Sequence, residues 1–480
     1  MSSTRDSFHE RVRAAVGDPH LQAALLSTTG RLQSAREQAL GTLGCADALR
    51  DHARRIRAHA LGTLDSCLTR FAEAAMARGT HVHWAPTAAD AVRYVVELAR
   101  ARHARLVVKS KSMISEEIEI NGALEAAGVR VVETDLGEFI VQLGGDRPSH
   151  IIMPIIHRTS ADVAALFREK LGASDEEVSS IPAMTALARR TLRHEFLRAD
   201  IGISGANFAV AETGSVCLVT NEGNGRLTTS APRVHVALIG IERVVPTLDD
   251  LGVLLQLLAR SATGQPLSVY TSIINGPRRR PGTTGLEGQD GEPDGPDEVH
   301  FVLVDNGRSR LLAGPCAEIL YCIRCGACLN ACPVFRAIGG HAYGGVYPGP
   351  IGSVFEPAQH VATTPSELPH ASSLCGACRD ACPVRIDIPT LLLKLRAQPV
   401  MVKDAPRWLR AGMTAFAFVA ARPFLYRWSA RAARWFTRWS ARDGWVSRLP
   451  GPLAAWTRHR EFPAFAPRSF TEIWHARRTP

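Results

Sequence analysis

Two cysteine-rich segments, residues 322–333 and 371–383, place the strongest constraint on what this chain of 480 residues can fold into. The first reads CIRCGACLNACP and has the spacing C-x2-C-x2-C-x3-C-P, with thiols at Cys322, Cys325, Cys328 and Cys332. Two-residue gaps let one tight turn of the backbone point successive sulfur atoms at a common centre. This is the spacing with which bacterial ferredoxins hold [4Fe–4S] clusters, so it predicts an iron–sulfur domain.

Zinc is the alternative metal for such a segment. Structural zinc usually takes two separated CxxC pairs, whereas here the ligands follow one another and end in Cys-Pro. In proteins with two clusters, the fourth cysteine of each run reaches the other cluster. This rule assigns four thiols to cluster 1, namely Cys322, Cys325, Cys328 and Cys382. It assigns three thiols to cluster 2, namely Cys332, Cys375 and Cys378.

The second segment, ASSLCGACRDACP, has Ser372 at the position of its first cysteine, so cluster 2 lacks one thiolate. Three arrangements are open. Cluster 2 could be [3Fe–4S] with an empty corner, or [4Fe–4S] with Ser372, water or a substrate on the fourth iron. Alternatively another cysteine could complete it, and Cys316 is the nearest in sequence, although it could equally be a small buried apolar residue.

The rest of the sequence is that of an ordinary globular protein, with 46% hydrophobic and 21% charged residues. The N-terminus is polar, and the longest apolar run, AGMTAFAFVAA at 411–421, is too short to span a bilayer. We therefore expect a cytoplasmic protein, in which clustered CxxC spacings indicate metal binding rather than disulfides. No GxGxxG fingerprint for a flavin or nicotinamide stands between a strand and a helix.

Strand and helix patterns alternate between residues 80 and 310, which predicts an α/β sheet domain. We expect single strands at 80–85, 105–110, 129–135, 234–245 and 299–307, and a pair joined at Thr213-Gly214. Helices are expected at 88–104, 115–128, 160–197 and 248–264, and a Gly/Pro-rich loop at 276–298. The predicted domains are a helical segment at 1–69, the α/β domain at 70–310, a helical ferredoxin-like domain at 311–396 and a basic helical extension at 397–480.

Taken with their flanks, the cysteine segments resemble the lactate utilisation protein B family. The resemblance rests on CIRCGACLNACPVFRAIGGHAYGGVYPGPIG and ELPHASSLCGACRDACPVRIDIP, and upstream on VVKSKSMISEEIEIN, ETDLGEFIVQL, ADIGISGANFAVAETGSVCLVTNEGNGRL and VLVDNGRS. It covers roughly residues 50–400. The family also has three cysteines after two serines in its second motif, which implies that Ser372 is the family's own residue. Cys316 is not part of the family pattern.

The resemblance implies an iron–sulfur subunit of a three-protein system that oxidises L-lactate to pyruvate. Its partners would be a cysteine-rich-domain protein and a smaller protein with the same lactate-utilisation domain. It also implies an α/β fold like that of CoA transferases and ribose-phosphate isomerases, which does not by itself carry an activity. Because clusters pass single electrons, we expect this chain to relay electrons, while a partner or an unrecognised cofactor acts on lactate.

Two polar blocks of the α/β domain could form a pocket. One is Lys109-Ser110-Lys111-Ser112, which precedes a helix and suits an anion. The other comprises Glu212-Thr213-Gly214 and Asn221-Glu222-Gly223-Asn224. A glutamate on such a turn could be a nucleophile, which would make the chain a CoA-transferase-like enzyme with structural or regulatory clusters; otherwise these residues are ordinary turn formers. His81, His83, His157 and His235 are expected at the surface or in packing.

The C-terminal extension carries the basic charge of the chain. Residues 401–480 contain 15 Lys and Arg against 4 Asp and Glu, and the whole chain has a net charge of +10. Along 427–442, arginines at 427, 431, 434, 438 and 442 share one helical face, beside Trp428, Trp435 and Trp439. This face would dock on protein, self or partner, or contact an anionic membrane to reach a quinone acceptor. No nucleic-acid reader motif accompanies the charge, so nucleic acid is not an expected partner.

Overall fold

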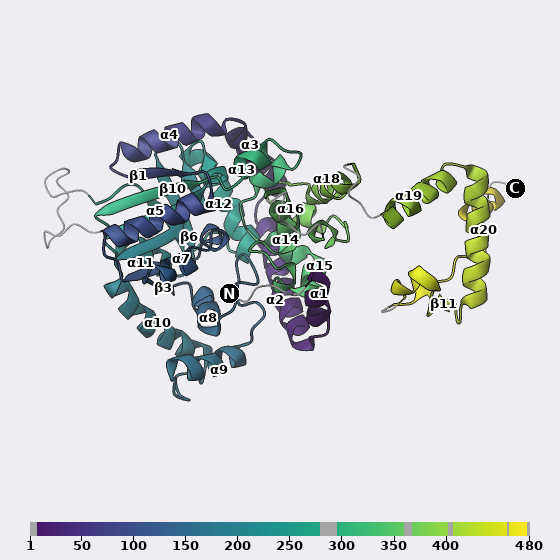
Figure 1. Cartoon of the computed structure of the whole chain (residues 1–480), viewed down its shortest axis with the longest axis horizontal. Coiled ribbons are helices and arrows are strands. Elements are labelled where there is room, and N and C mark those ends of the chain that lie inside the picture. The colour runs from purple at the N-terminus through teal and green to yellow at the C-terminus, as the bar shows by residue number, and fades with distance from the viewer. Residues whose placement is uncertain (1–6, 279–294, 360–366, 402–406, 458–459, 478–480) are drawn as a thin grey trace. The chain divides into compact units, whose positions relative to one another are not determined.

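The structure is a computed structural model of the chain and describes residues 7–278, 295–359, 367–401, 407–457 and 460–477. The chain forms two compact units, Met1–Arg396 and Ala397–Pro480, which are treated separately below (Figure 1). Most of the predicted 276–298 loop lies outside the described residues. The domain boundaries at 69, 310 and 396 stay predictions.

A six-stranded parallel sheet forms the centre of the first unit, in the order β1-β10-β7-β4-β2-β3. Its strands are β1 (His81–Ala85), β2 (Leu106–Lys109), β3 (Arg130–Glu133), β4 (Ile201–Gly205), β7 (Val234–Gly240) and β10 (Glu298–Val304). Strands β2, β4, β7 and β10 are almost entirely buried, as parallel sheets require, whereas the edge strand β1 is mostly half-buried or exposed. The predicted α/β fold is confirmed, although β4 was not expected from the sequence.

Helices cover both faces of this sheet. They are α4 (Leu64–Met76), α5 (Ala88–Ala101), α6 (Met113–Glu117), α7 (Ile120–Ala126), α8 (Leu136–Gly144), α9 (Ser160–Leu171), α10 (Ile181–Arg198) and α11 (Asn224–Ser230). The helix predicted at 115–128 is wrong in one respect, because it breaks at Glu119, whose φ of 53° is left-handed. The break leaves the end of α6 free to turn Glu117 toward the buried Arg308.

A second, four-stranded sheet has the order β8-β5-β6-β9 and packs beside α12 (Leu248–Thr263). Its strands are β5 (Phe208–Val210), β6 (Ser215–Thr220), β8 (Val244–Val245) and β9 (Tyr270–Ile274). The expected hairpin at Thr213-Gly214 is β5–β6. The single strand predicted at 234–245 is wrong: β7 ends at Gly240, a 3-10 turn (Ile241–Arg243) follows, and β8 joins the other sheet.

The cysteine-rich part of the first unit is helical. Its helices are α13 (Arg308–Leu312), α14 (Ala327–Ala331), α15 (Pro333–Ile338), α16 (Gly349–Gln359), α17 (Ala377–Ala381) and α18 (Ile388–Met401), with 3-10 turns η2 (Ala317–Tyr321), η3 (His341–Tyr343) and η4 (Leu368–His370). Within its described residues, 311–359 and 367–396, no strand is present. This agrees with the predicted helical ferredoxin-like architecture.

Three N-terminal helices pack directly on the cysteine-rich part. They are α1 (Phe8–Val16), α2 (Pro19–Gly41) and α3 (Ala46–Gly62). Helix α2 contacts α14 and α15 on one side and α12 on the other, and α3 contacts η2. A single apolar core therefore runs from these helices through the cysteine segments to α12. The sequence predicted helices here but not that they would enclose the cysteines.

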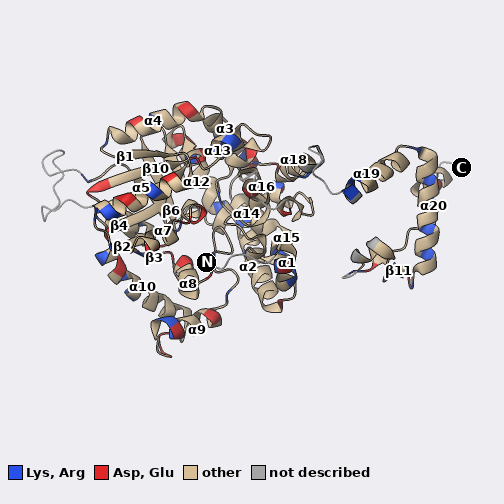
Figure 2. Cartoon of the chain, in the orientation of Figure 1, with Lys and Arg blue, Asp and Glu red and all other residues tan. Residues whose placement is uncertain are grey.

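The second unit contains α19 (Arg407–Ala420), α20 (Pro423–Ser440), a small antiparallel pair β11 (Trp445–Val446) and β12 (Phe462–Pro463), η5 (Gly451–Ala455) and α21 (Phe470–Ala476). Arginines recur along α20, where they colour segments of the helix blue (Figure 2). Trp428, Trp435 and Trp439 on the same helix are 65%, 70% and 76% exposed. Across the part of the chain that the structure describes, no helix combines the length and apolar character needed to cross a membrane.

Candidate metal centre and the adjoining cavity

The two cysteine segments adopt the same backbone conformation, offset by fifty residues. Arg324 and Leu374, each before a cysteine, are left-handed with φ of 60° and 57°. Gly326 and Gly376 follow with φ of 75° and 88°, and each begins a five-residue helix, α14 or α17. A left-handed non-glycine residue is costly, so its recurrence at one position of both segments indicates a shared ligand loop.

The four thiols predicted for cluster 1 line one cavity of about 20 Å³. They come from both segments, and apolar side chains complete the wall: Ile151, Ile323, Ile351, Val384, Ile386 and Ile388. Backbone N–H groups point at two of these sulfur atoms, from Arg324 to Cys322 Sγ (3.3 Å) and from Ile386 to Cys382 Sγ (3.4 Å). Such N–H···S contacts are among the features that tune a bound cluster.

Burial makes these thiols hard to ionise without a metal. It raises the pKa of Cys325 to about 12 and that of Cys382 to about 11. Metal binding requires thiolates, and arginines act in the favourable direction: Arg36 lowers the pKa of Cys325 and Arg50 that of Cys382. A dry, cation-flanked cage of four thiols fits an iron–sulfur cluster.

The three thiols predicted for cluster 2 also lie close enough to influence one another. Burial and the neighbouring Cys332 raise the pKa of Cys378 to about 12, and Cys375 acts on both. Cys375 is exposed, and hydrogen bonds from the Ala377 backbone and the Ser373 side chain lower its pKa. Site 2 thus reaches the surface, whereas site 1 is more enclosed. The assignment of ligands to the two clusters stays a prediction.

No three or more His, Cys, Asp or Glu side chains among the described residues converge on a single point as ligands of one metal ion would. A four-iron cube binds each thiolate through a different iron atom, so its ligands surround a volume and need not meet at one point.

Arginines from the N-terminal helices hold the second segment in place. Arg50 donates to the carbonyl oxygens of Cys382 (2.9 Å from Nη2) and Asp380 (2.6 Å). Arg36 donates to the carbonyl oxygen of Ala381 (2.8 Å). Arg57, fully buried, donates to the carbonyls of Val244 and Leu320 and so ties the second sheet to η2. No sequence pattern indicated these roles, because one arginine among many on a helix has no distinguishing feature.

A buried ionic network joins the α/β part to the cysteine-rich part. Arg308, 1% exposed, binds Glu117 (2.7 Å) and Glu242 (2.7 Å). Tyr347 donates to Glu117 (2.6 Å), and Gln359 donates to the same carboxylate (2.8 Å). Burial alone would raise the pKa of Glu117, but Arg308 outweighs it and holds this pKa at about 2.

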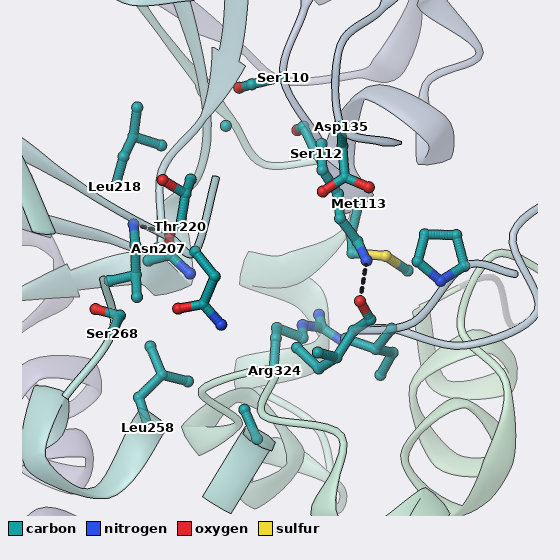
Figure 3. A pocket seen from close by; sticks show the side chains of 18 of the residues that line it. Ser110, Ser112, Met113, Asp135, Asn207, Leu218, Thr220, Leu258, Ser268 and Arg324 are labelled. Carbon is teal, nitrogen blue, oxygen red and sulfur yellow. Dashed lines mark hydrogen bonds between the residues drawn. The ribbon is translucent and has the colours of Figure 1, made fainter. Parts of the chain in front are cut away.

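A larger cavity of about 740 Å³ lies between the α/β part and the cysteine-rich part (Figure 3). Two blocks expected to form a pocket meet here. The first contributes Ser110, Lys111 and Ser112, and the second contributes Asn221, Glu222 and Asn224. Apolar residues such as Met113, Leu218 and Leu258 line much of the remainder.

Other predicted residues lie elsewhere. Lys109 is not in the cavity wall, since its ammonium is buried against Glu116 (2.5 Å) and Glu133 (2.8 Å). Glu212 accepts a hydrogen bond from the backbone of Leu248 (3.0 Å) at the start of α12. Gly214 packs against α4, where an added Cβ would stand 2.2 Å from the nitrogen of Ala75.

The four histidines singled out in the sequence take part in local contacts. His81 stacks on His300 and His83 on Tyr94, with ring centroids 4.7 and 4.0 Å apart. His157 lies 3.3 Å from Asp146, and the buried His235 contacts the hydroxyl of Ser204 at 2.8 Å.

Arg243 and Arg324 link the large cavity to site 1, and the sequence did not single them out. Both line the cavity. Arg324 precedes Cys325, and Arg243 donates to the carbonyl oxygen of Cys322 (3.1 Å). Ile151 lines both cavities, which are therefore neighbours at that residue. A molecule bound in the large cavity would therefore lie next to site 1.

The α/β part, the cysteine-rich part and the C-terminal part of the chain each match a known protein family. Residues 68–304 match the LUD domain, residues 318–386 match the 4Fe–4S dicluster domain, and residues 403–479 match the C-terminal region of lactate utilisation protein B. The chain is 44% identical to lactate utilization protein B of Geobacillus sp. (strain WCH70) over 462 residues, covering 95% of this chain and 94% of that protein. It belongs to the lactate utilisation protein B family.

Other members extend the same match. The chain is 44% identical to lactate utilization protein B of Bacillus pumilus over 476 residues (98% of this chain, 97% of that protein). It is 41% identical over 470 residues to a protein of Escherichia coli K12 called "uncharacterized electron transport protein YkgF" (98% and 96%). A solved DUF162 family protein from Deinococcus radiodurans covers 50% of this chain and 98% of its own, at 13% identity and a TM-score of 0.26, which is too low to support an argument.

Membership of the family confirms the resemblance that the cysteine segments and their flanks predicted. It supports iron–sulfur binding, a place in lactate utilisation and a role in electron transfer.

Proposed function

We propose that this chain is the electron-transfer subunit of a complex that oxidises L-lactate to pyruvate, and that it relays the electrons through two clusters. The proposal rests on one observation above all. The thiols form two groups, and each group takes members from both cysteine segments. One group is enclosed beside the 740 Å³ cavity, and the other reaches the surface at Cys375. An enclosed site next to a ligand cavity and a second site open to a partner are what a relay needs.

The residues of the chain divide this task between them. Bound clusters would supply one-electron transfer, while the oxidation of lactate releases two electrons and two protons. The apolar wall of site 1 excludes water. The hydrogen bonds of Arg50 and Arg36 fix the second segment relative to the first. In this proposal the exposed thiol of Cys375 marks the side on which electrons pass to or from another subunit.

The proposed partners are a cysteine-rich-domain protein and a smaller protein with a LUD domain. The predicted cytoplasmic location remains part of the proposal. We propose further that the second unit docks on one of these proteins, since its arginines and exposed tryptophans form a basic apolar face on α20. Contact with an anionic membrane is the other outcome. Flotation of the protein with anionic liposomes would support the membrane, and its absence from the lipid fraction would exclude it.

The relay is tested with the reconstituted complex and L-lactate. A Cys322→Ser variant should lose lactate-dependent reduction of an added acceptor, and Cys375→Ser should also lose it. Cys45→Ser is the matched control, because Cys45 is an exposed thiol far from the motifs in sequence. If Cys322→Ser and Cys375→Ser both assemble into the complex and both keep the wild-type electron flow, the relay is contradicted and the chain acts only as a scaffold.

A second candidate function is transfer of an acyl group through Glu222, as in a CoA-transferase-like enzyme. One observation favours it: Glu222 lines the large cavity, and partial burial of its carboxyl group together with Asp135 raises its pKa to about 7. Glu212, the other candidate nucleophile, lies outside the cavity wall. Incubation with an acyl-CoA, followed by mass spectrometry for an adduct on Glu222, distinguishes the two functions. An adduct supports the transferase, and its absence supports the relay.

A further inference from the structure

The second ligand loop has an oxygen atom where the first has a sulfur atom. Ser372 lies fifty residues after Cys322, and the residues that follow match in conformation, including left-handed Arg324 and Leu374 and the glycines Gly326 and Gly376. At the far ends of the loops, Cys332 and Cys382 share an extended conformation, with ψ of 120° and 121°. The backbone at Ser372 is therefore built like that of a ligand.

The side chain at this position makes the same local contact in both loops. The N–H of Arg324 donates to Cys322 Sγ at 3.3 Å. The N–H of Leu374 donates to Ser372 Oγ at 3.1 Å. Because the donor is two residues along in each case, Ser372 Oγ lies at the position in its loop that Cys322 Sγ occupies in the other.

An arginine also fixes the backbone of this position in each loop. Arg243 donates to the carbonyl oxygen of Cys322 (3.1 Å). Arg396, on α18, donates to the carbonyl oxygen of Ser372 (3.0 Å) and to that of Pro369 (2.8 Å). Two arginines from unrelated elements thus support equivalent carbonyls, which is expected where both positions must be held still.

Cys316 is the competing ligand, and its surroundings do not resemble a ligand loop. It is 2% exposed, precedes η2 and is packed in the apolar core. Burial raises the pKa of its thiol, and Lys394 is the charged group that acts on it. It lies outside the fifty-residue repeat, so no loop geometry directs it toward site 2.

We propose that Ser372 Oγ is the fourth protein ligand of cluster 2, which makes that cluster a [4Fe–4S] centre held by three sulfurs and one oxygen. In forming the iron–oxygen bond, the hydroxyl group breaks its O–H bond and releases the proton to water, since Ser372 is only partly buried. The proposal rests on the existence of cluster 2, which is part of the proposed function.

The test uses the full-length protein, purified without oxygen, with iron analysis and electron paramagnetic resonance. Wild type should hold about eight iron atoms, four in each [4Fe–4S] cluster. Ser372→Ala should lose one iron and give a [3Fe–4S] signal when oxidised. Ser372→Cys should keep the iron and change the reduction potential of one cluster only, and it serves as the readout if the alanine variant does not fold.

Two matched controls separate ligation from disturbance of the region. Cys45→Ser removes an exposed thiol outside both cysteine segments, and Cys316→Ser removes the competing thiol; both should keep the wild-type iron content and spectrum. A wild-type [3Fe–4S] signal, an unchanged spectrum in Ser372→Ala, or iron loss in Cys316→Ser would each overturn the proposal. A wild type with only about four iron atoms would instead show that cluster 2 is absent, so the proposed function itself would fail.

Discussion

Arg50 of α3 donates two hydrogen bonds to the carbonyl oxygen of Cys382, from Nε at 3.2 Å and from Nη2 at 2.9 Å. The two residues are 332 positions apart, and the arginine is 9% exposed. A residue of the N-terminal helices therefore supports the last ligand predicted for cluster 1. The N-terminal segment, which the sequence predicted only to be helical, is part of the framework of the candidate metal centre.

Replacing this arginine should loosen the centre. Arg50→Ala leaves the carbonyls of Cys382 and Asp380 without their charged donor, which should cost about 2–3 kcal/mol of unfolding free energy. Iron release to a chelator, followed by absorbance, should be faster than in wild type. Arg55→Ala is the control, because Arg55 is exposed on the same helix. Equal release rates in the two variants would contradict the supporting role.

The Arg308 network should be sensitive to loss of either partner. Arg308→Met leaves Glu117 and Glu242 as buried charges without their cationic partner, which should lower the free energy of unfolding by about 3–5 kcal/mol. We expect little folded protein from this variant at 37 °C. The double variant Arg308→Met/Glu117→Gln should recover part of the loss, since it removes one of the stranded charges. Thermal unfolding of the single and double variants measures the recovery.

The same network predicts a dependence of stability on pH. The pKa of Glu117 is lowered to about 2 in the folded protein, against about 4.3 in an unfolded chain. Its stabilisation is therefore present above pH 4.3 and is lost as the pH falls toward 2. The difference in unfolding midpoint between wild type and Glu117→Gln should be constant from pH 5 to pH 7 and should narrow below pH 4. A constant difference down to pH 3 would contradict this assignment.

Gly214 should tolerate no side chain, because the backbone of α4 lies too close to it. Gly214→Ala places a Cβ 2.2 Å from the backbone nitrogen of Ala75, at a φ of 64°. Gly128 also has positive φ (82°) but open space around it. Gly128→Ala should therefore lower the free energy of unfolding by only about 1–2 kcal/mol, through backbone strain. Gly214→Ala should lower it distinctly more, because the added Cβ also meets α4. Similar thermal midpoints for the two variants would show that α4 moves aside freely.

Glu222 should affect the stability of the folded protein at neutral and alkaline pH, and not in acid. Its pKa is raised to about 7, so ionisation destabilises the folded protein as the pH rises from about 4.3 through 7. Above pH 7, Glu222→Gln should therefore be more stable than wild type, by no more than about 1 kcal/mol, because the side chain is largely open to solvent although its carboxyl group is partly buried, and solvent screens the charge. At pH 4 the two should unfold alike. In the relay, this variant keeps its electron flow; in the transferase, it loses acyl transfer.

The sequence predicted those parts of the molecule that depend on local pattern. The cysteine spacing and the alternation of strands and helices indicated the iron–sulfur domain and the α/β sheet. The turn at Ile241–Arg243 was missed because apolar residues continue on both sides of it. Within the turn, Glu242 contacts Arg308, 66 positions away, which no local pattern could indicate. Strand β4 was missed because IGISG carries two glycines and little strand signal.

The candidate site shows the same limit. The blocks at 110–112 and 221–224 were recognised because polar, glycine-bearing segments followed strands. Arg243 and Arg324 were not, since only the packing of the cysteine-rich part on the α/β part brings them to one cavity. Lys109 and Lys111 look equivalent in sequence, yet one is paired with two glutamates and the other lines the cavity.

The interleaving of the two segments also sets an order for biosynthesis. In the proposed assignment, three ligands of cluster 1 leave the ribosome some fifty residues before the fourth, Cys382. The N-terminal helices that hold the second segment are made first, but Arg50 lacks its carbonyl partners in that segment until Asp380 and Cys382 have been made. In the proposed assignment, the enclosed centre can therefore be completed only once Cys382 has been made, long after the N-terminal helices whose arginines hold that segment.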